Sequence, residues 1–189
     1  MERRKYNMSE EIKSIIDKRV LVIDGAMGTQ LQIADIKDKA WEYEGNNLEG
    51  CNELLNLTAP EILETIHDAY LEAGADLITT NTFGSMPWVL DEYQIPQTSY
   101  ELSRLGAKLV KDSCDKFSTP QKPRYVLGSI GPGTKLPSLG HITYDEMYEG
   151  YKIMAQGLVD GGTDVFLLET CQDPLQIKAG LHALKDVAP

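Results

Sequence analysis

The feature that most constrains the fold is an alternation, repeated four times, between a short apolar run and a longer amphipathic stretch. The apolar runs are predicted strands, and they cover residues 20–24, 76–80, 124–129 and 164–169. Strands that alternate with helices in this way form βαβ units. The sequence therefore predicts a mixed α/β fold with a parallel sheet.

The predicted helices have recognisable first turns. Three open with Thr-x-x-Glu, the pattern of a capping box, at Thr58, Thr98 and Thr143. The fourth opens with Asp173-Pro174, and we expect it to bury Ile177, Leu181 and Leu184. A shorter amphipathic helix is expected over residues 9–18, within an N-terminal extension covering residues 1–19.

Two architectures fit this alternation: an open doubly wound sheet, or a (β/α)₈ barrel of which only about the first four βα units are present. A complete barrel needs about 250 residues, and the chain has 189. Every predicted strand runs into polar or glycine-rich residues at its carboxyl end, namely Asp24-Gly25, Asn81-Thr82, Gly131-Pro132 and Glu169-Thr170. A barrel builds its site from many such strand ends, so we expect the half barrel, as a single partial domain over residues 1–189.

Charge and hydropathy exclude several classes of partner. The net charge of −11 disfavours nucleic acid. No apolar run is long enough to span a bilayer, and the first twenty residues lack a signal-peptide core. We therefore expect a cytoplasmic protein with no membrane partner.

Its three cysteines form no CxxC pair and are expected to be reduced thiols. Residues 29–57 lack sustained periodicity and are expected to form a loop that could cover a site.

Glu169 is the sharpest candidate for chemistry, because it emerges from the apolar run Val165–Leu168. A partly desolvated carboxylate there would bind an ammonium group or act as a base; the alternative is a charge that merely ends a strand. Asp24 and Gly25 occupy the equivalent place on the first strand and form either a ligand cradle or a plain turn. Asn81 and Thr82 could bind a ligand or form an Asx-type turn.

Several ordered motifs together resemble the homocysteine S-methyltransferase family, most closely its cobalamin-dependent, methionine-forming branch. The resemblance runs from about residue 20 to the end of the sequence. The motifs are Asp24-Gly-Ala-Met-Gly-Thr29, Gly50-Cys-Asn-Glu-Leu-Leu-Asn-Leu57, Glu72-Ala-Gly-Ala-Asp76, Thr80-Asn-Thr-Phe83, Gly128-Ser-Ile-Gly-Pro132 and Leu168-Glu-Thr170.

The resemblance implies a barrel in which zinc, held by three cysteines, binds the thiol of homocysteine and presents a thiolate to an activated methyl group. It further implies that the backbone N–H groups of Asp24 and Gly25 hold the homocysteine carboxylate and that Glu169 holds its amino group. Cobalamin would be carried on a separate module.

The sequence departs from the family in the residues that hold zinc. Cys51, Cys114 and Cys171 do not lie in the family's late cysteine motifs, so no metal ligand and no catalytic residue is assigned. We expect the zinc ligands, the rest of the barrel and a cobalamin or folate module to lie outside this chain, and the chain alone to be inactive. Two alternatives remain: a relative that uses S-methylmethionine or betaine, and a non-catalytic amino-acid-binding or assembly domain.

Overall fold

The computed structural model describes residues 10–188, and its centre is a three-stranded parallel sheet. The strands are β3 (Leu77–Thr79), β4 (Tyr125–Ile130) and β5 (Val165–Leu168), in the order β3-β4-β5. Leu77 pairs with Tyr125, and Leu127 pairs with Val165. Three of the four predicted strands and their parallel pairing are confirmed.

The prediction of a buried strand over residues 20–24 is wrong. This segment lies beside β3 and contacts it through two interactions. One is an isolated parallel bridge between Ile23 and Leu77, and the other is a hydrogen bond of 3.0 Å from the Asp24 N–H to the Leu77 carbonyl. Most of its apolar side chains face solvent, with Val20 84% and Ile23 49% exposed, while Leu21 packs partly buried against the cluster around Leu77. The segment lies at the edge of the sheet, which explains why an apolar run ends up exposed.

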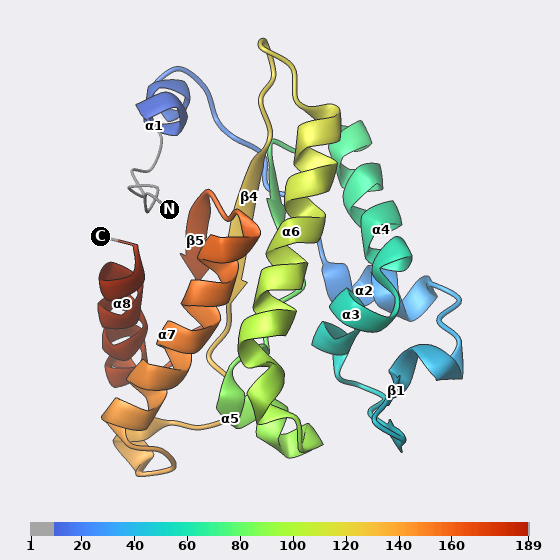
Figure 1. The fold of residues 1–189 in the computed structure, drawn as a ribbon. Helices are drawn as coiled ribbons and strands as arrows, with labels where there is room; N and C mark the ends of the chain where they lie inside the picture. Colours follow the sequence, from blue (N-terminus) through green and yellow to red (C-terminus); the bar gives the residue numbers. More distant parts are fainter. Residues whose placement is uncertain (1–9, 189) are drawn as a thin grey trace.

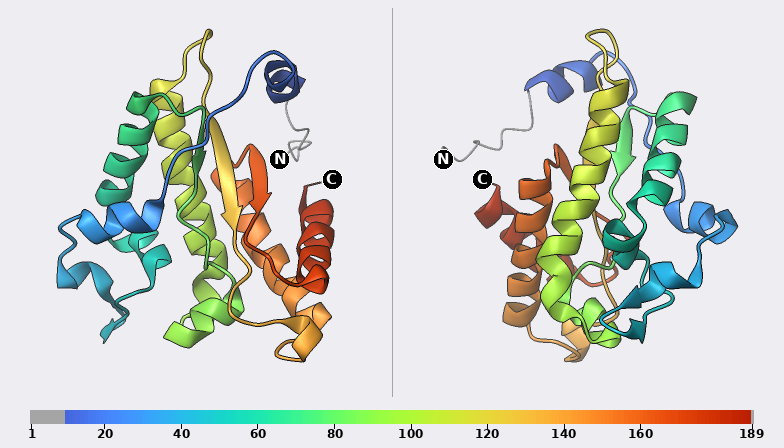
Figure 2. Two further views of the ribbon diagram at one scale, coloured as in Figure 1. Left: turned by 180° about the vertical axis from the view of Figure 1, so that it is seen from behind. Right: turned by 45° about the vertical axis from the view of Figure 1, so that its right-hand side comes forward.

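Four long helices cover one face of the sheet. They are α4 (Pro60–Ala73), α6 (Ser99–Phe117), α7 (Tyr144–Gly161) and α8 (Pro174–Val187) (Figures 1 and 2). The strand order follows the chain, with a helix returning from each strand to the next on the same side. A doubly wound sheet has helices on both faces and a reversal of strand order, so this arrangement differs from that alternative.

Alternation along the strands separates an outer face from an inner face. On the outer face, the buried side chains of Ile78 and Val126 pack against the helices. On the inner face, the short helix α1 (Glu10–Ile16) covers the amino-terminal ends of the strands, where Ile12, 1% exposed, packs against Leu77 and Tyr125. Part of the predicted N-terminal helix is thus confirmed, while its start at Ser9 lies outside the described residues.

One of the three predicted capping boxes is present. Thr143 accepts a hydrogen bond from the Glu146 N–H, and the Glu146 side chain accepts one from the Thr143 N–H. The boxes at Thr58 and Thr98 are absent, because Thr58 belongs to the preceding helix and Thr98 already has a helical backbone conformation. Their hydroxyls donate to carbonyls instead, that of Thr58 to Ala40 and Leu54 and that of Thr98 to Ile95. Asp173 caps α8 as predicted, accepting from the Leu175 N–H.

The buried stripe of α8 differs from the predicted one. Its buried residues are small or polar, namely Gln176, Ala179, Gly180 and Ala183. Ile177 and Leu181 instead point outward, 38% and 50% exposed, and line a shallow groove with Phe166. Gly180 lies against Leu168, where an added Cβ would come within 2.9 Å of a leucine methyl. The helix therefore approaches β5 closely through its small residues.

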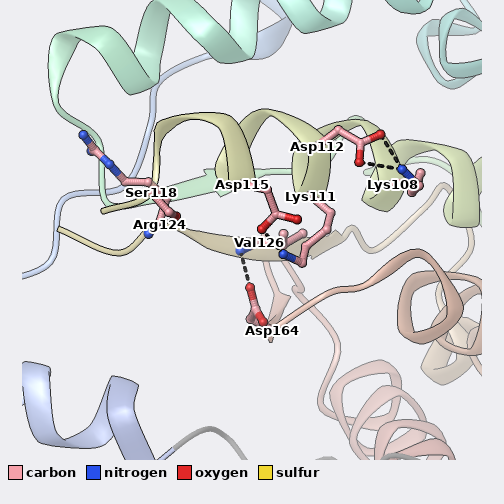
Figure 3. Close-up of polar contacts among 8 residues, drawn as sticks. All are labelled: Lys108, Lys111, Asp112, Asp115, Ser118, Arg124, Val126 and Asp164. Atoms are coloured by element: carbon pink, nitrogen blue, oxygen red, sulfur yellow. Dashed lines mark hydrogen bonds and ion pairs between the residues drawn. The ribbon is translucent and has the colours of Figure 1, made fainter. Parts of the chain in front are cut away.

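The amino-terminal end of the sheet is held by aspartates and surface ion pairs. Asp164, just before β5, accepts a hydrogen bond of 2.9 Å from the Val126 N–H (Figure 3). On the neighbouring surface of α6, Lys108 pairs with Asp112 and Lys111 with Asp115. Such exposed pairs contribute little to stability, so the aspartate-to-backbone bond is the more important contact.

The segment expected to be a loop is largely folded into short elements. They are α2 (Met27–Ile33), η1 (Asp38–Trp41), the hairpin of β1 (Glu42–Tyr43) and β2 (Asn46–Asn47), η2 (Asn52–Leu54) and α3 (Leu55–Thr58). Later in the chain come α5 (Pro87–Leu90), η3 (Asp91–Tyr93), η4 (Pro96–Thr98) and η5 (Pro137–Leu139). Leu31 and Leu55 share a buried cluster with Leu63 of α4. Among the described helices, none is both long and apolar enough to cross a membrane.

Candidate functional site at the carboxyl ends of the strands

The inner face of the sheet changes from apolar to polar toward the carboxyl ends of its strands. In its amino-terminal half this face carries Leu77, Tyr125, Leu127, Val165 and Leu167. The next inward positions on the three strands are Thr79, Ser129 and Glu169, by the two-residue alternation of a strand. The apolar half is covered by α1, so the polar half is where this face can meet a ligand.

Glu169 is half-buried and is held by two contacts. Its N–H donates to the Ile130 carbonyl over 3.0 Å, which extends the β4–β5 pairing. The Ser129 hydroxyl donates to carboxylate oxygen Oε1 over 2.7 Å. Within residues 10–188, the second oxygen, Oε2, has no hydrogen-bond partner and the carboxylate forms no ion pair. Glu169 thus presents one free carboxylate oxygen at the predicted place.

The residue after Glu169 has an uncommon backbone conformation. Thr170 has a φ of 60°, in the left-handed region that β-branched residues rarely adopt. Such a conformation costs roughly 1–3 kcal/mol and persists only where its surroundings impose it. The strained residue directly follows Glu169 in the chain, and strained residues tend to cluster at functional sites.

Asp24 lies at the carboxyl end of the edge segment and accepts hydrogen bonds from one residue of β3. The Thr79 N–H donates to Oδ2 over 3.0 Å, and the Thr79 hydroxyl lies 3.0 and 3.1 Å from the two oxygens. Burial raises the pKa of Asp24 to about 6, against the lowering effect of these hydrogen bonds, and the charge of Glu169 raises it further. The site is therefore acidic and lacks a compensating cation within the described chain.

The turn at Asp24-Gly25 differs in one respect from the arrangement implied by the resemblance. The Asp24 N–H already donates to Leu77, so it is not available to a ligand carboxylate. The Gly25 N–H donates no hydrogen bond within residues 10–188, and the residue is exposed. A Cβ at Gly25 would come within 2.8 Å of the Tyr70 hydroxyl oxygen, so the close approach of Tyr70 favours glycine here.

Asn81 and Thr82 are buried, 7% and 0% exposed, and their side chains contact the protein itself. The Asn81 amide donates to the Asn52 carbonyl over 2.7 Å, which ties the end of β3 to the preceding segment. The Thr82 hydroxyl donates to the Ser129 carbonyl over 2.7 Å. The structure thus places both residues beneath the site surface, where they support it.

The cysteines do not form a metal site. Burial raises the pKa of both Cys51 and Cys114 to about 12. Burial and the charge of Glu169 also raise the pKa of Cys171, whose thiol lies 3.4 Å from the Glu169 carbonyl. Metal binding requires thiolates, and within residues 10–188 no group of three or more His, Cys, Asp or Glu side chains could hold a metal ion. The described residues therefore do not fit a zinc ion.

Sequence reasoning missed Thr79 and Ser129 as parts of the site. Both were assigned only to strands, although counting inward positions from Leu77 and Leu127 identifies them. Their hydroxyl groups contact the two carboxylates that were predicted. The sequence signal that could have identified them is the two-residue alternation along each strand, followed to the position nearest the strand's carboxyl end.

Together the fold and the candidate site define an α/β protein with a singly wound parallel sheet and two acidic side chains at the carboxyl ends of its strands. The chain belongs to the homocysteine S-methyltransferase family, whose family model matches residues 21–189. It is 48% identical over 177 residues to the methionine synthase of Mycobacterium tuberculosis (strain ATCC 25618 / H37Rv) and 48% identical over 176 residues to that of Mycobacterium leprae (strain TN). These matches cover 94% and 93% of this chain but only 14% of each relative.

Solved structures share the fold. The homocysteine methyltransferase MmuM from Escherichia coli matches in its oxidized form with a TM-score of 0.75 at 20% identity, and in its metallated form with a TM-score of 0.74 at 22% identity. The matches cover 94% and 93% of this chain and 62% of the solved chain. At this level of identity the likeness establishes the fold alone.

Proposed function

We propose that this chain is the homocysteine-binding portion of a methionine synthase, and that it forms about the first four βα units of a (β/α)₈ barrel. Family membership and the 48% identity to two methionine synthases support the assignment. The sequential parallel sheet with its long helices on one side supports the partial barrel. So does the 62% coverage of a solved chain with the same fold.

The observation that carries the proposal is the half-satisfied carboxylate of Glu169. With Oε1 bound by Ser129, Oε2 is free to accept a hydrogen bond from the ammonium group of an amino acid. The Gly25 N–H then serves the amino acid's carboxylate. Three further residues support the site without contacting the ligand. Asp24 adds negative charge, and Asn81 and Thr82 fix the end of β3.

The activation of the homocysteine thiol is assigned to groups outside this chain. A bound zinc ion would supply a thiolate at neutral pH, but the described residues offer no donor set for it. We therefore place the zinc ligands, the rest of the barrel and a cobalamin-carrying module elsewhere. On this proposal the chain by itself binds homocysteine and does not methylate it.

Replacing Glu169 tests the proposal. Glu169→Gln removes the charge that pairs with the ammonium, so we expect homocysteine affinity to fall about ten- to a hundredfold, as for a lost charge-assisted hydrogen bond. Equilibrium dialysis with radiolabelled homocysteine measures this. Glu149→Gln is the matched control, because Glu149 is an exposed glutamate of α7 that pairs with Lys152. Unchanged affinity in the Glu169 variant contradicts the proposal, as does methionine formation by the chain alone supplied with zinc and a methyl donor.

A further inference from the structure

We propose that Ser129 is a positioning residue that orients the Glu169 carboxylate toward the ammonium group of the ligand. This inference rests on the proposed function, because it assigns a task to a residue that does not itself contact the ligand. The amino end of the ligand is then recognised by two strands together, β4 through Ser129 and β5 through Glu169.

The first support is the geometry of the contact between the two side chains. Ser129 is 4% exposed, and its hydroxyl donates to Oε1 of Glu169 over 2.7 Å. A glutamate side chain on a strand end has three rotatable bonds, and in water it samples many rotamers. The hydrogen bond selects the rotamers that keep Oε1 against β4 and leaves Oε2 available to the ligand.

The second support is that the backbone of Ser129 is itself clamped by two threonines. The Ser129 N–H donates to the Thr80 hydroxyl over 3.0 Å, and the Thr82 hydroxyl donates to the Ser129 carbonyl over 2.7 Å. The two threonine hydroxyls lie 2.5 Å apart. Since Thr82 has already given its only hydrogen to Ser129, Thr80 is the donor between them. The three residues thus form a closed ring of hydrogen bonds.

The third support is a contrast with two other buried serines, both on α6. Ser99 and Ser103, both 0% exposed, donate to backbone carbonyls over 2.6 and 2.7 Å. These bonds are local satisfaction of a buried hydroxyl within or beside α6. Ser129 instead satisfies its hydroxyl on an ionisable side chain of another strand, at the end of the sheet where the site lies.

The experiment compares two ligands that differ only in the amino group: homocysteine and 4-mercaptobutanoate. Dialysis with the wild-type chain is expected to show tighter binding of homocysteine. We expect Ser129→Ala to weaken homocysteine binding about five- to tenfold, because the carboxylate must now be ordered by the ligand, and to leave 4-mercaptobutanoate unaffected. Ser129→Thr retains the hydroxyl and is expected to restore the preference. A merely structural role would weaken both ligands equally.

The control is Ser103→Ala, which also removes a buried hydroxyl with a 2.7 Å hydrogen bond. It is expected to leave both affinities unchanged. If Ser129→Ala does not fold, Ser129→Cys replaces it, since it keeps the volume with only a weak donor. Unchanged preference in Ser129→Ala or Ser129→Cys, or equal weakening of both ligands by them, overturns the inference while leaving Glu169 in place. A wild-type chain with no preference overturns the proposed role of Glu169 and this inference with it.

Discussion

Two aspartates at opposite ends of the sheet make the same backbone contact in opposite electrostatic surroundings. Asp76, at the amino-terminal end, accepts from the Val22 N–H over 2.9 Å, and Asp24, at the carboxyl end, accepts from the Thr79 N–H over 3.0 Å. The Arg19 guanidinium makes two hydrogen bonds of 2.8 Å to Asp76 and holds the pKa of that carboxyl below its usual value. Within residues 10–188 no cation pairs with Asp24, and burial raises its pKa to about 6.

The difference shows which end of the sheet the described chain completes by itself. At the amino-terminal end the buried charge is neutralised by Arg19, and α1 covers the inner face. At the carboxyl end, Asp24 and Glu169 place two carboxylates near each other, and none of the cations in the described part of the chain pairs with them. An uncompensated acidic pair costs stability, and a positively charged ligand group would relieve that cost.

The largest expected effect comes from breaking the completed end. Asp76 is 2% exposed, so Asp76→Ala leaves the Val22 N–H and Arg19 without their partner. We expect the free energy of unfolding to fall by about 3 kcal/mol, measured by urea denaturation. Arg19→Met leaves the buried carboxylate with a single backbone donor, and it is expected to lower the free energy of unfolding by less than Asp76→Ala does. A loss below about 0.5 kcal/mol in both variants contradicts the view that this end is held by the pair.

The opposite sign is expected at the carboxyl end. Asp24→Asn keeps an acceptor for the Thr79 N–H and removes the desolvated charge, so it is expected to stabilise the protein at pH 7.5. The difference between the ordinary pKa of 3.8 and about 6 corresponds to roughly 3 kcal/mol, and partial exposure reduces this to about 2 kcal/mol. The wild-type chain is expected to recover this stability as the pH falls through 6 toward 3.8, because the folded state binds the proton more tightly.

The measurement is the difference in unfolding free energy between the Asp24→Asn variant and the wild type at each pH. His67, buried on α4, has a pKa lowered to about 4 by burial and changes stability in the opposite direction. Because it is present in both proteins, its effect cancels in the difference. A difference that does not vary between pH 4 and 7 shows that Asp24 is not the strained carboxylate described.

The smallest expected effect compares two glycines from the two ends. Gly162 ends α7 at the amino-terminal end of the sheet with a φ of 101°, so Gly162→Ala is expected to cost about 1 kcal/mol. Gly28, in α2 near the carboxyl end, has nothing within 4 Å of an added Cβ. Gly28→Ala is expected to be neutral or to stabilise by less than about 1 kcal/mol, the interior value, because Gly28 lies in the first turn of α2. Thermal or urea unfolding of the two variants distinguishes them, and equal costs contradict the assignment.

The sequence indicated the sheet and the position of the site because both depend on local patterns. Apolar runs that end in polar residues predicted β3, β4 and β5. They also predicted that Glu169 lies at the carboxyl end of a strand. Residues 20–24 were predicted to be a buried strand but lie exposed at the edge of the sheet, because an apolar run does not reveal how many neighbouring strands will cover it. Val20 is apolar and yet 84% exposed.

The errors in the helices have physical reasons. The spacing of large apolar residues in α8 predicted that Ile177 and Leu181 are buried. The helix instead packs closely through Ala179 and Gly180, whose small side chains contribute little to a hydrophobic pattern. The Thr58 hydroxyl found carbonyl partners, one of them on Ala40, which is distant in sequence. The hydrogen-bond partner of such a side chain depends on tertiary contacts. For the same reason, the contact between Ser129 and Glu169 could not be predicted from their spacing in the sequence.

The ring formed by Thr80, Thr82 and Ser129 has a consequence for the energy of ligand recognition. Each hydroxyl hydrogen in the ring has one position, because every donor has a single acceptor left to it. The Thr80 and Thr82 hydroxyls need not turn when a ligand arrives, and the Ser129 backbone, whose side chain binds Glu169, is already fixed. The site therefore avoids most of the reorganisation energy that water molecules around a free carboxylate would incur.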